Sequence, residues 1–322
     1  MVKPSFDLSG NSPAPDALET AGMNEPQHIC VCVCTYKRPH LLKRLLQSLA
    51  IQETGSLFTY SIVVADNDQL RSAELAVSEF AAASSVPIQY CVEPKQNISL
   101  ARNRAIASAR GEFVALIDDD EFCTSNWLLT LFEACQQYGV DGVLGPVKRH
   151  FDEKPPKWIV KGSFYERHVF PTGTILDWRD GRTGNVLLKR HIFAAALPPF
   201  RPEFRGGEDQ DFFRRMIDEG YAFIWCDEAV AYEVVPPARW RRTYMLRKAL
   251  LRGAVTVVHP TFGARDIIKS LIAVPAYIVA LPFTLILGQH KFVALLVRLF
   301  DHLGKLLELL GMNPVKEPYV AG

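Results

Sequence analysis

The sequence lacks the glycine-rich loops by which two large classes of nucleotide-binding enzyme hold phosphates. No Gly-x-Gly-x-x-Gly follows the first expected strand, and no Walker A sequence occurs in the 322 residues. Both loops cradle phosphate through closely approaching backbone N–H groups. Their absence therefore argues against a dehydrogenase and against a P-loop NTPase.

Cysteines are few and odd in number, at seven, and residues 1–26 contain no apolar core of the kind that a secretory signal needs. Cys30, Cys32 and Cys34 alternate along one expected strand, whereas zinc sites usually draw paired cysteines from turns. We therefore expect small core side chains rather than a metal cluster, and a reduced, cytosolic setting.

Four consecutive acidic residues, 118–121, directly follow the apolar run 113–117. The run has the length and composition of a buried strand, and ligands of open α/β sheets bind at the carboxyl ends of strands. Because crowded carboxylates repel one another, a shared Mg²⁺ or Mn²⁺ would stabilise them. Asp118 and Asp120 share one face of the strand as an Asp-x-Asp pair. The alternative is a solvated acidic turn that caps the next helix.

Apolar strands and amphipathic helices alternate along the first half of the chain. The expected strands are 29–34, 60–65, 88–92 and 113–117, and the expected helices are 39–50, 70–84, 99–111 and 125–138. Pro39 suits the first turn of the first helix, Ser99 is the expected N-cap of the third, and Gly139 ends the fourth. This βαβαβ order predicts an α/β fold with a doubly wound, mostly parallel sheet of the Rossmann-like type.

Polar residues follow three of these strands and meet at one edge of the predicted sheet. The three groups are residues 35–38, 66–68 and 118–120. Asp66 can accept from a pyrimidine imide N–H, Tyr36 can pack on a base, and Arg102 or Lys37 can meet phosphate oxygens. Taken singly, Asp66 could equally be a turn acid and Arg102 a charge on a helix surface.

Six stretches of the chain carry a family resemblance: 31–39, 62–68, 97–105, 113–121, 183–185 and 206–211. With these stretches, in this order, the sequence resembles the family 2 inverting glycosyltransferases with the GT-A fold. The most similar group is the bacterial exopolysaccharide and lipid-linked oligosaccharide enzymes of the succinoglycan glucosyltransferase type. The resemblance implies a nucleotide-sugar donor, usually linked to UDP, and a metal held by the Asp-x-Asp motif.

The resemblance also implies roles for individual residues. Asp209, in a cluster that opens an expected helix, is the implied catalytic base, and Glu208 and Asp211 would orient the acceptor or support the base. The alternative for these acids is capping of the helix dipole. The implied donor-binding residues are Thr35, Tyr36, Lys37, Asp66, Arg102, Asp118, Asp119 and Asn185. The implied ligands of Mn²⁺ or Mg²⁺ are Asp118, Asp120 and Glu233.

Two features depart from the family pattern. Glu233 stands where many relatives have a metal-ligating histidine, and it could equally pair with Arg239 or Arg241. The processive-synthase signature Gln-x-x-Arg-Trp is missing, and residues 237–240 only partly resemble it. We therefore expect one sugar to be added per turnover. Residues 155–180 are expected to form an acceptor-side loop with an aromatic platform, or an ordinary loop anchored by a tryptophan.

The overall charge of +1 hides a strong asymmetry, because residues 236–269 carry +7 and residues 1–235 carry −7. The basic segment is followed by an uncharged apolar run, 271–287, which contains Pro275 and Pro282. Basic residues flank this run on both sides. A kinked, re-entrant or in-plane membrane segment is therefore favoured over a simple span, with a buried core hairpin as the alternative.

The predicted organisation has five parts: a disordered tail (1–26), a catalytic domain (27–235), a basic helical stem (236–269), a membrane-associated segment (270–311) and a tail (312–322). The predicted function is transfer of a sugar, from UDP-hexose, to a polyprenyl-diphosphate-linked glycan. The expected location is the cytoplasmic face of the inner membrane, with no nucleic-acid partner. A soluble or protein acceptor, and a catalytically silent nucleotide-sugar-binding protein, are the alternatives.

Overall fold

The computed structural model describes residues 26–195, 197–204, 206–312 and 315. The tails predicted at 1–26 and 312–322 lie almost entirely outside the described residues.

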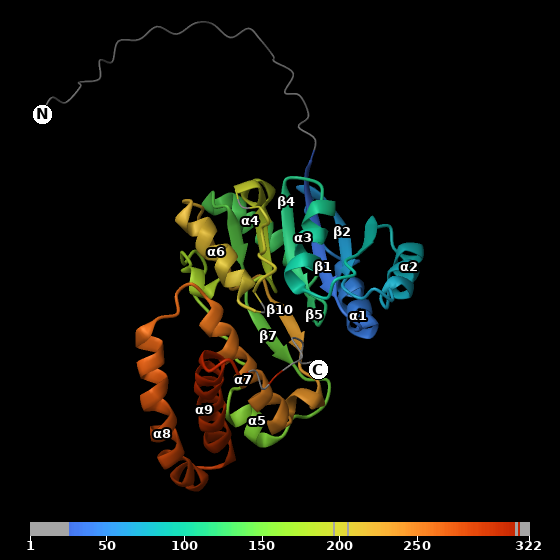
Figure 1. The fold of residues 1–322 in the computed structure, drawn as a ribbon. Coiled ribbons are helices and arrows are strands. Elements are labelled where there is room, and N and C mark those ends of the chain that lie inside the picture. The colour runs from blue at the N-terminus through green and yellow to red at the C-terminus, as the bar shows by residue number, and fades with distance from the viewer. Residues whose placement is uncertain (1–25, 196, 205, 313–314, 316–322) are drawn as a thin grey trace, which may run out of the picture.

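A seven-stranded sheet forms the centre of the molecule (Figure 1). Its order is β3-β2-β1-β4-β8-β6-β9, and neighbours are parallel except that β8 runs antiparallel to β4 and β6. The strands are β1 Gln27–Thr35, β2 Phe58–Asp66, β3 Ile88–Val92, β4 Phe113–Asp118, β6 Gly142–Leu144, β8 Val186–Lys189 and β9 Phe223–Trp225. The predicted mostly parallel sheet is confirmed, and the four predicted strands lie within two residues of their expected bounds.

Five helices cover the two faces of this sheet: α1 Pro39–Leu49, α2 Glu74–Ala83, α3 Ile98–Ser108, α4 Trp127–Tyr138 and α6 Glu208–Asp218. Pro39 occupies the first turn of α1, and Gly139 ends α4 with a φ of 64°, as predicted. The predicted N-cap of α3 was wrong. Its cap is Asn97, whose Oδ1 accepts from the Leu100 N–H at 3.1 Å, whereas Ser99 lies inside the first turn.

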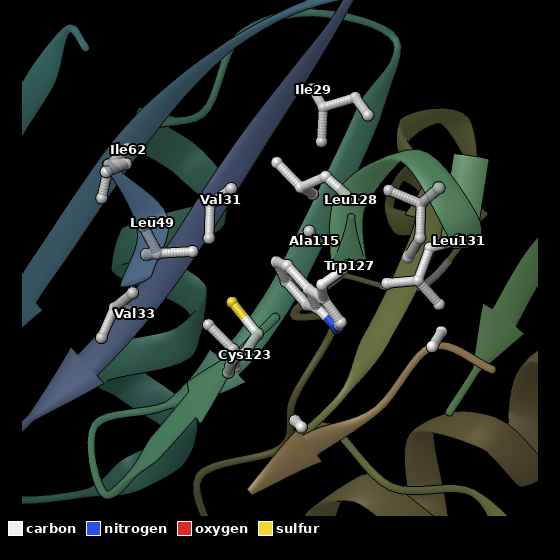
Figure 2. Packing of buried hydrophobic residues seen from close by; sticks show 14 of the residues in the cluster. Ile29, Val31, Val33, Leu49, Ile62, Ala115, Cys123, Trp127, Leu128 and Leu131 are labelled. Atoms are coloured by element: carbon white, nitrogen blue, oxygen red, sulfur yellow. The ribbon is translucent and has the colours of Figure 1, made fainter. Parts of the chain in front are cut away.

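Side chains alternate along β1 between two buried clusters. Ile29, Val31 and Val33 pack with Trp127 of α4 on one face (Figure 2). Cys30 and Cys32 lie in the cluster on the other face, which includes α3 and α6. Both cysteines are free and buried, so they are core side chains as predicted. Because each buried aliphatic side chain contributes about 1.5–3 kcal/mol, this two-sided burial fixes the register of β1.

A second sheet of three short strands lies beyond the carboxyl ends of the central strands (Figure 1). Its order is β5-β10-β7, with β5 Glu121–Cys123, β10 Ala231–Val234 and β7 Val147–His150. β5 begins one residue after Asp120, so the acidic cluster occupies the junction of the two sheets. In the antiparallel pair of β10 and β5, Glu233 stands directly opposite Glu121.

Three long helices, α7 Arg242–Val258, α8 Ala264–Ile286 and α9 Gln289–Leu309, lie on the side of the small sheet (Figure 1). The short helix α5 Lys157–Lys161 packs against them through Ile159, which meets Met245 and Val293. The remaining elements are short 3₁₀ helices: η1 Trp178–Asp180, η2 Arg190–Ala195 and η3 Pro237–Trp240.

The outermost helix, α8, is continuous through Pro275 and Pro282 and packs along α9, away from the central sheet (Figure 1). Its apolar side chains face outward; Val279 is 68% exposed and Ile286 is 85% exposed. Among the described residues it is the one helix long and apolar enough to cross a membrane, and 6% of its most apolar window is buried. The alternative of a buried core hairpin is therefore wrong.

Candidate active site

A cavity of about 410 Å³ opens at the carboxyl ends of β1 and β4, where the central sheet meets the small sheet. Its charged lining contains six cations and four acids. The cations are Lys37, Arg38, Arg102, Arg167, Arg239 and Lys248, and the acids are Asp118, Asp119, Asp120 and Glu233. The remaining lining residues are Cys34, Thr35, Tyr36, Asn67 and Ile98. The excess of cations suits an anionic ligand, and the position is the one that α/β sheets use for ligands.

Asp119 is held from two sides at the floor of the cavity. The Thr35 hydroxyl donates to its Oδ2 at 2.8 Å, and the Arg38 guanidinium lies 3.1 Å from its Oδ1. Burial raises the pKa of Asp119 to about 7. Thr35 and Asp119, both predicted to bind the donor, are thus hydrogen-bonded to each other.

Asp118 is the most accessible member of the acidic cluster, with 43% of its side chain exposed. The neighbouring Glu121 is buried, and its Oε1 has no hydrogen-bond partner among the described residues. Burial, followed by the Asp118 charge, raises the pKa of Glu121 well above its usual range. A Cβ atom on Gly184 would lie 2.8 Å from Glu121 Oε1 and 2.9 Å from Asp118 Oδ2. The Thr-Gly-Asn stretch therefore needs glycine here so that the two carboxyl groups can approach.

The three predicted metal ligands do not form an open cation site in this arrangement. Arg239 places its Nη2 2.6 Å from Asp120 Oδ2 and its Nη1 2.8 Å from Glu233 Oε1. Arg38 contacts Asp120 as well, at 3.2 Å, and Arg167 contacts Glu233 at 2.5 Å. In the described part of the chain, no three His, Cys, Asp or Glu side chains are grouped to hold a metal. The alternative expectation that Glu233 pairs with Arg239 is confirmed.

Arg102 forms ion pairs with both the acidic cluster and the start of α6. It is 8% exposed, forms an ion pair with Glu208, and places its Nη2 3.7 Å from Asp118 Oδ1. Arg102 is therefore not a helix-surface charge. The Arg102–Glu208 pair brings the start of α6 next to the cavity.

The two aspartates at the start of α6 lie in different surroundings. Asp209 is partly exposed beside Glu208, and burial followed by that neighbouring charge raises its pKa to about 6. Asp211 is fully buried and pairs with Arg215 at 2.9 Å, with Arg201 and Arg214 each 3.6 Å away. Of the predicted catalytic acids, Glu208 and Asp209 lie together, whereas Asp211 is turned into a separate arginine cluster.

Two predicted donor-binding residues have all their polar contacts inside the protein. Asp66 is fully buried and accepts from the Asp68 and Ala73 N–H groups and from the Tyr90 hydroxyl, which are contacts expected of a turn acid. The Asn185 amide accepts from the Trp127 indole N–H at 2.7 Å and donates to the carbonyls of Pro146 and Ala229. Neither residue lines the cavity, whereas Tyr36 and Lys37 do.

Several lining residues had no predicted role. Arg38 belongs to the first strand-end group and follows Lys37, so the same reasoning could have included it. Arg167 and Lys248 come from distant segments whose local sequence carries no signal for the cavity. Arg167 lies in the predicted acceptor-side loop. Trp158 of the same loop does not line the cavity. It packs against Phe164, with ring centroids 5.5 Å apart.

Comparison with known proteins identifies the class to which the chain belongs. The model of the family described as glycosyl transferase family 2 matches residues 30–192, and the chain belongs to this family. It is therefore a glycosyltransferase, as predicted.

Among curated proteins, the chain is similar to the succinoglycan biosynthesis protein ExoM of Rhizobium meliloti (strain 1021). The two are 34% identical over 232 residues, which cover 71% of this chain and 74% of ExoM. This similarity confirms the predicted resemblance.

Two solved structures share the fold. The mannosyltransferase PcManGT from Pyrobaculum calidifontis, solved with GDP-Man and Mn²⁺, superposes with a TM-score of 0.60 at 17% identity and covers 90% of this chain and 89% of its own. Residues 1–349 of TarS from S. aureus, solved with UDP-GlcNAc, give a TM-score of 0.50 at 16% identity, with coverages of 89% and 93%. The predicted GT-A fold with a C-terminal helical region is confirmed.

Proposed function

We propose that this glycosyltransferase moves a sugar from a nucleotide-sugar donor, UDP-hexose, to a hydroxyl of a lipid-linked glycan during exopolysaccharide synthesis. The observation that carries the proposal is the cation-rich cavity beside Glu208 and Asp209 at the start of α6. The cations would bind the diphosphate of the donor, and the partly exposed carboxylate of Asp209 would accept the proton of the acceptor hydroxyl. The named role of ExoM in succinoglycan biosynthesis supports the exopolysaccharide setting.

On the donor side, the diphosphate would lie among Lys37, Arg102 and the other cations of the cavity. Guanidinium groups suit phosphate because they offer paired N–H donors in one plane. Tyr36 also lines the cavity and would pack on the base. The solved relatives hold UDP-GlcNAc and GDP-Man, which supports a nucleoside diphosphate sugar as the donor class.

On the acceptor side, Asp209 is the proposed base. Its carboxylate takes the proton of the acceptor hydroxyl while the hydroxyl oxygen forms a bond to the anomeric carbon. The bond from that carbon to the diphosphate oxygen breaks, and the diphosphate leaves with the bonding electrons, stabilised by the surrounding cations. Because the attack comes from the face opposite the leaving group, the configuration is inverted.

Dependence on Mn²⁺ or Mg²⁺ is part of the proposal, and the Mn²⁺ in PcManGT supports it. Of the proposed ligands, Asp118 has the most accessible carboxylate, with 43% of its side chain exposed, since Asp120 and Glu233 are paired with arginines.

The proposed location is the cytoplasmic face of the plasma membrane. The outward-facing apolar side chains of α8 and the +7 charge of residues 236–269 support contact with an anionic lipid surface. A polyprenyl-diphosphate-linked acceptor would be presented at the same surface. A soluble or protein acceptor is the competing assignment.

The test is transfer by the purified full-length protein in nanodiscs, using a panel of labelled nucleotide sugars and a lipid extract that contains glycan acceptors. We expect label from one donor to enter the organic phase, and Asp209→Asn to slow that transfer about 10²–10⁴-fold. Asp218→Asn, on the exposed end of the same helix, is the matched control and should transfer normally. Label that enters only water-soluble product would contradict the lipid-linked acceptor.

A further inference from the structure

Arg239 bridges the two acids that the proposed function assigns to a metal. One guanidinium nitrogen contacts Asp120 at 2.6 Å and another contacts Glu233 at 2.8 Å. The arginine is 5% exposed, and 10% and 16% of the two acidic side chains are exposed. A cation therefore already lies between these carboxylates, and it is a side chain of the chain itself.

The bridge joins three segments that line the cavity. Asp120 comes from the turn between β4 and β5, Glu233 from β10, and Arg239 from η3. The backbone of Arg239 is held independently, because its carbonyl accepts from the Tyr165 hydroxyl at 2.6 Å. Its Nε is buried without a hydrogen-bond partner in the described residues, so the two terminal nitrogens carry its contacts to acids. The backbone of Arg239 is thus anchored by a contact that does not involve the guanidinium.

A divalent cation and a guanidinium both bind to the ionised carboxylate oxygens of these acids. Mg²⁺ and Mn²⁺ bind through ionised carboxylate oxygens, and two buried carboxylates without a cation would repel one another. Loss of one partner from a buried ion pair leaves an uncompensated charge, which is strongly unfavourable. Arg38 contacts Asp120 and Arg167 contacts Glu233, but among the described residues Arg239 is the cation that contacts both acids. Arg239 and a metal therefore compete for the position between the two carboxylates.

We propose that Arg239 is a resident counter-cation that occupies the position between Asp120 and Glu233 and competes with divalent metal for it. This inference rests on the proposed assignment of Asp120 and Glu233 as metal ligands. It makes Arg239 a positioning residue that sets the metal affinity of the free protein. The metal binds only as the guanidinium leaves the two carboxylates.

The experiment titrates the purified full-length protein with Mn²⁺, without donor or acceptor. Electron paramagnetic resonance measures the free Mn²⁺, which gives the affinity of the protein for the metal. We expect Arg239→Gln to bind one Mn²⁺ at least tenfold more tightly than the wild type, because the glutamine is neutral. The gain should disappear in Arg239→Gln/Asp120→Asn. Arg241→Gln is the matched control: it removes the same charge from an exposed position and should leave the affinity unchanged.

A second variant protects the test from a folding failure. Arg239→Lys keeps one positive charge but cannot span both acids as a guanidinium does, and it should bind Mn²⁺ with intermediate affinity. In the same samples, Mn²⁺ should raise the melting temperature of the Arg239 variants more than that of the wild type.

Equal or weaker Mn²⁺ binding in both Arg239 variants would overturn the inference, as would a gain that survives Asp120→Asn. Neither result depends on sugar transfer. If the protein transfers sugar but the Arg239 variants show no gain in Mn²⁺ affinity, the inference alone is contradicted. If the variants show the gain but the protein transfers no sugar, the proposed function alone is contradicted.

Discussion

Asp209 and Asp211 lie two positions apart at the start of α6 and have opposite surroundings. Asp211 is fully buried among Arg201, Arg214 and Arg215, so its charge is balanced by the protein itself. Asp209 is partly exposed, and desolvation, followed by the charge of the neighbouring Glu208, disfavours its ionised form and raises its pKa. A carboxylate that ionises near neutral pH and reaches solvent is suited to accept a proton from a substrate.

The pH dependence of transfer tests this assignment. The reactive form of Asp209 is ionised, and its pKa is raised to about 6, so kcat/KM should rise with pH and level off above pH 6. Below that value the rate should fall about tenfold per pH unit. Steady-state kinetics between pH 4.5 and about 8, with an unfolding control at each pH, measure this limb.

In Asp209→Asn the residual rate should be about 10²–10⁴-fold lower and should lack the acidic limb, because the amide does not titrate in this range. Asp218→Asn should keep the wild-type profile. A limb that persists unchanged in Asp209→Asn would assign the base to another residue.

At the scale of elements, two glycines determine how closely α7 and α9 approach. A Cβ atom on Gly253 of α7 would lie 2.0 Å from the Asp301 carbonyl oxygen, and one on Gly304 of α9 would lie 2.2 Å from the Leu250 carbonyl oxygen. Backbone atoms cannot turn aside as a side chain can. The two helices therefore touch along their backbones, and α8 reaches the rest of the molecule mainly through α9.

Gly304→Ala should push α7 and α9 apart. The expected cost is about 1–3 kcal/mol in the free energy of unfolding, typical of overpacking, even though alanine favours a helix more than glycine does. Denaturant unfolding followed by circular dichroism measures it. Gly263→Ala is the control, since a Cβ there meets no atom within 4 Å, and a Gly304→Ala protein as stable as that control would contradict the close contact.

At the scale of the whole molecule, charge and apolar surface are distributed so that one side suits a membrane. Residues 236–269 carry +7, and α8 presents Ile278, Val279 and Phe283 to the outside. The acidic residues are concentrated in 1–235, which also contains the carboxylates of the cavity. Attachment through α8 and α7 would hold the cavity near an acceptor embedded in lipid.

Ile278→Lys/Phe283→Lys should release the protein from vesicles that contain anionic lipid. A lysine within the hydrocarbon costs about 2.5–3.5 kcal/mol, so the bound fraction in a flotation assay should fall more than tenfold. Leu75→Lys, which places the same charge on an exposed apolar position of α2, is the matched control. Equal flotation of the double variant and the control would show that α8 does not attach the protein to the membrane.

Local sequence predicted the central sheet well and the site only in part. The short apolar runs predicted β1 to β4 because strands of a mostly parallel sheet are buried on both faces, and Pro39 and Gly139 marked helix ends by their backbone constraints. Ser99 failed as an N-cap because Asn97, two residues earlier, has a side chain that caps the same turn. Two polar residues so close together compete for one role, and the tertiary contacts of Asn97 with Asn67 and Pro202 decide between them.

By itself the sequence determined which strands carry the acids and where those strands end, because side-chain alternation and chain order are local properties. The tertiary structure alone decided what each acid faces. Asp120 meets Arg239, 119 positions away, and Asp118 of β4 meets Arg102 of helix α3. The partner of a buried charge depends on which distant segment packs beside it, and that is fixed by the whole core rather than by any local pattern.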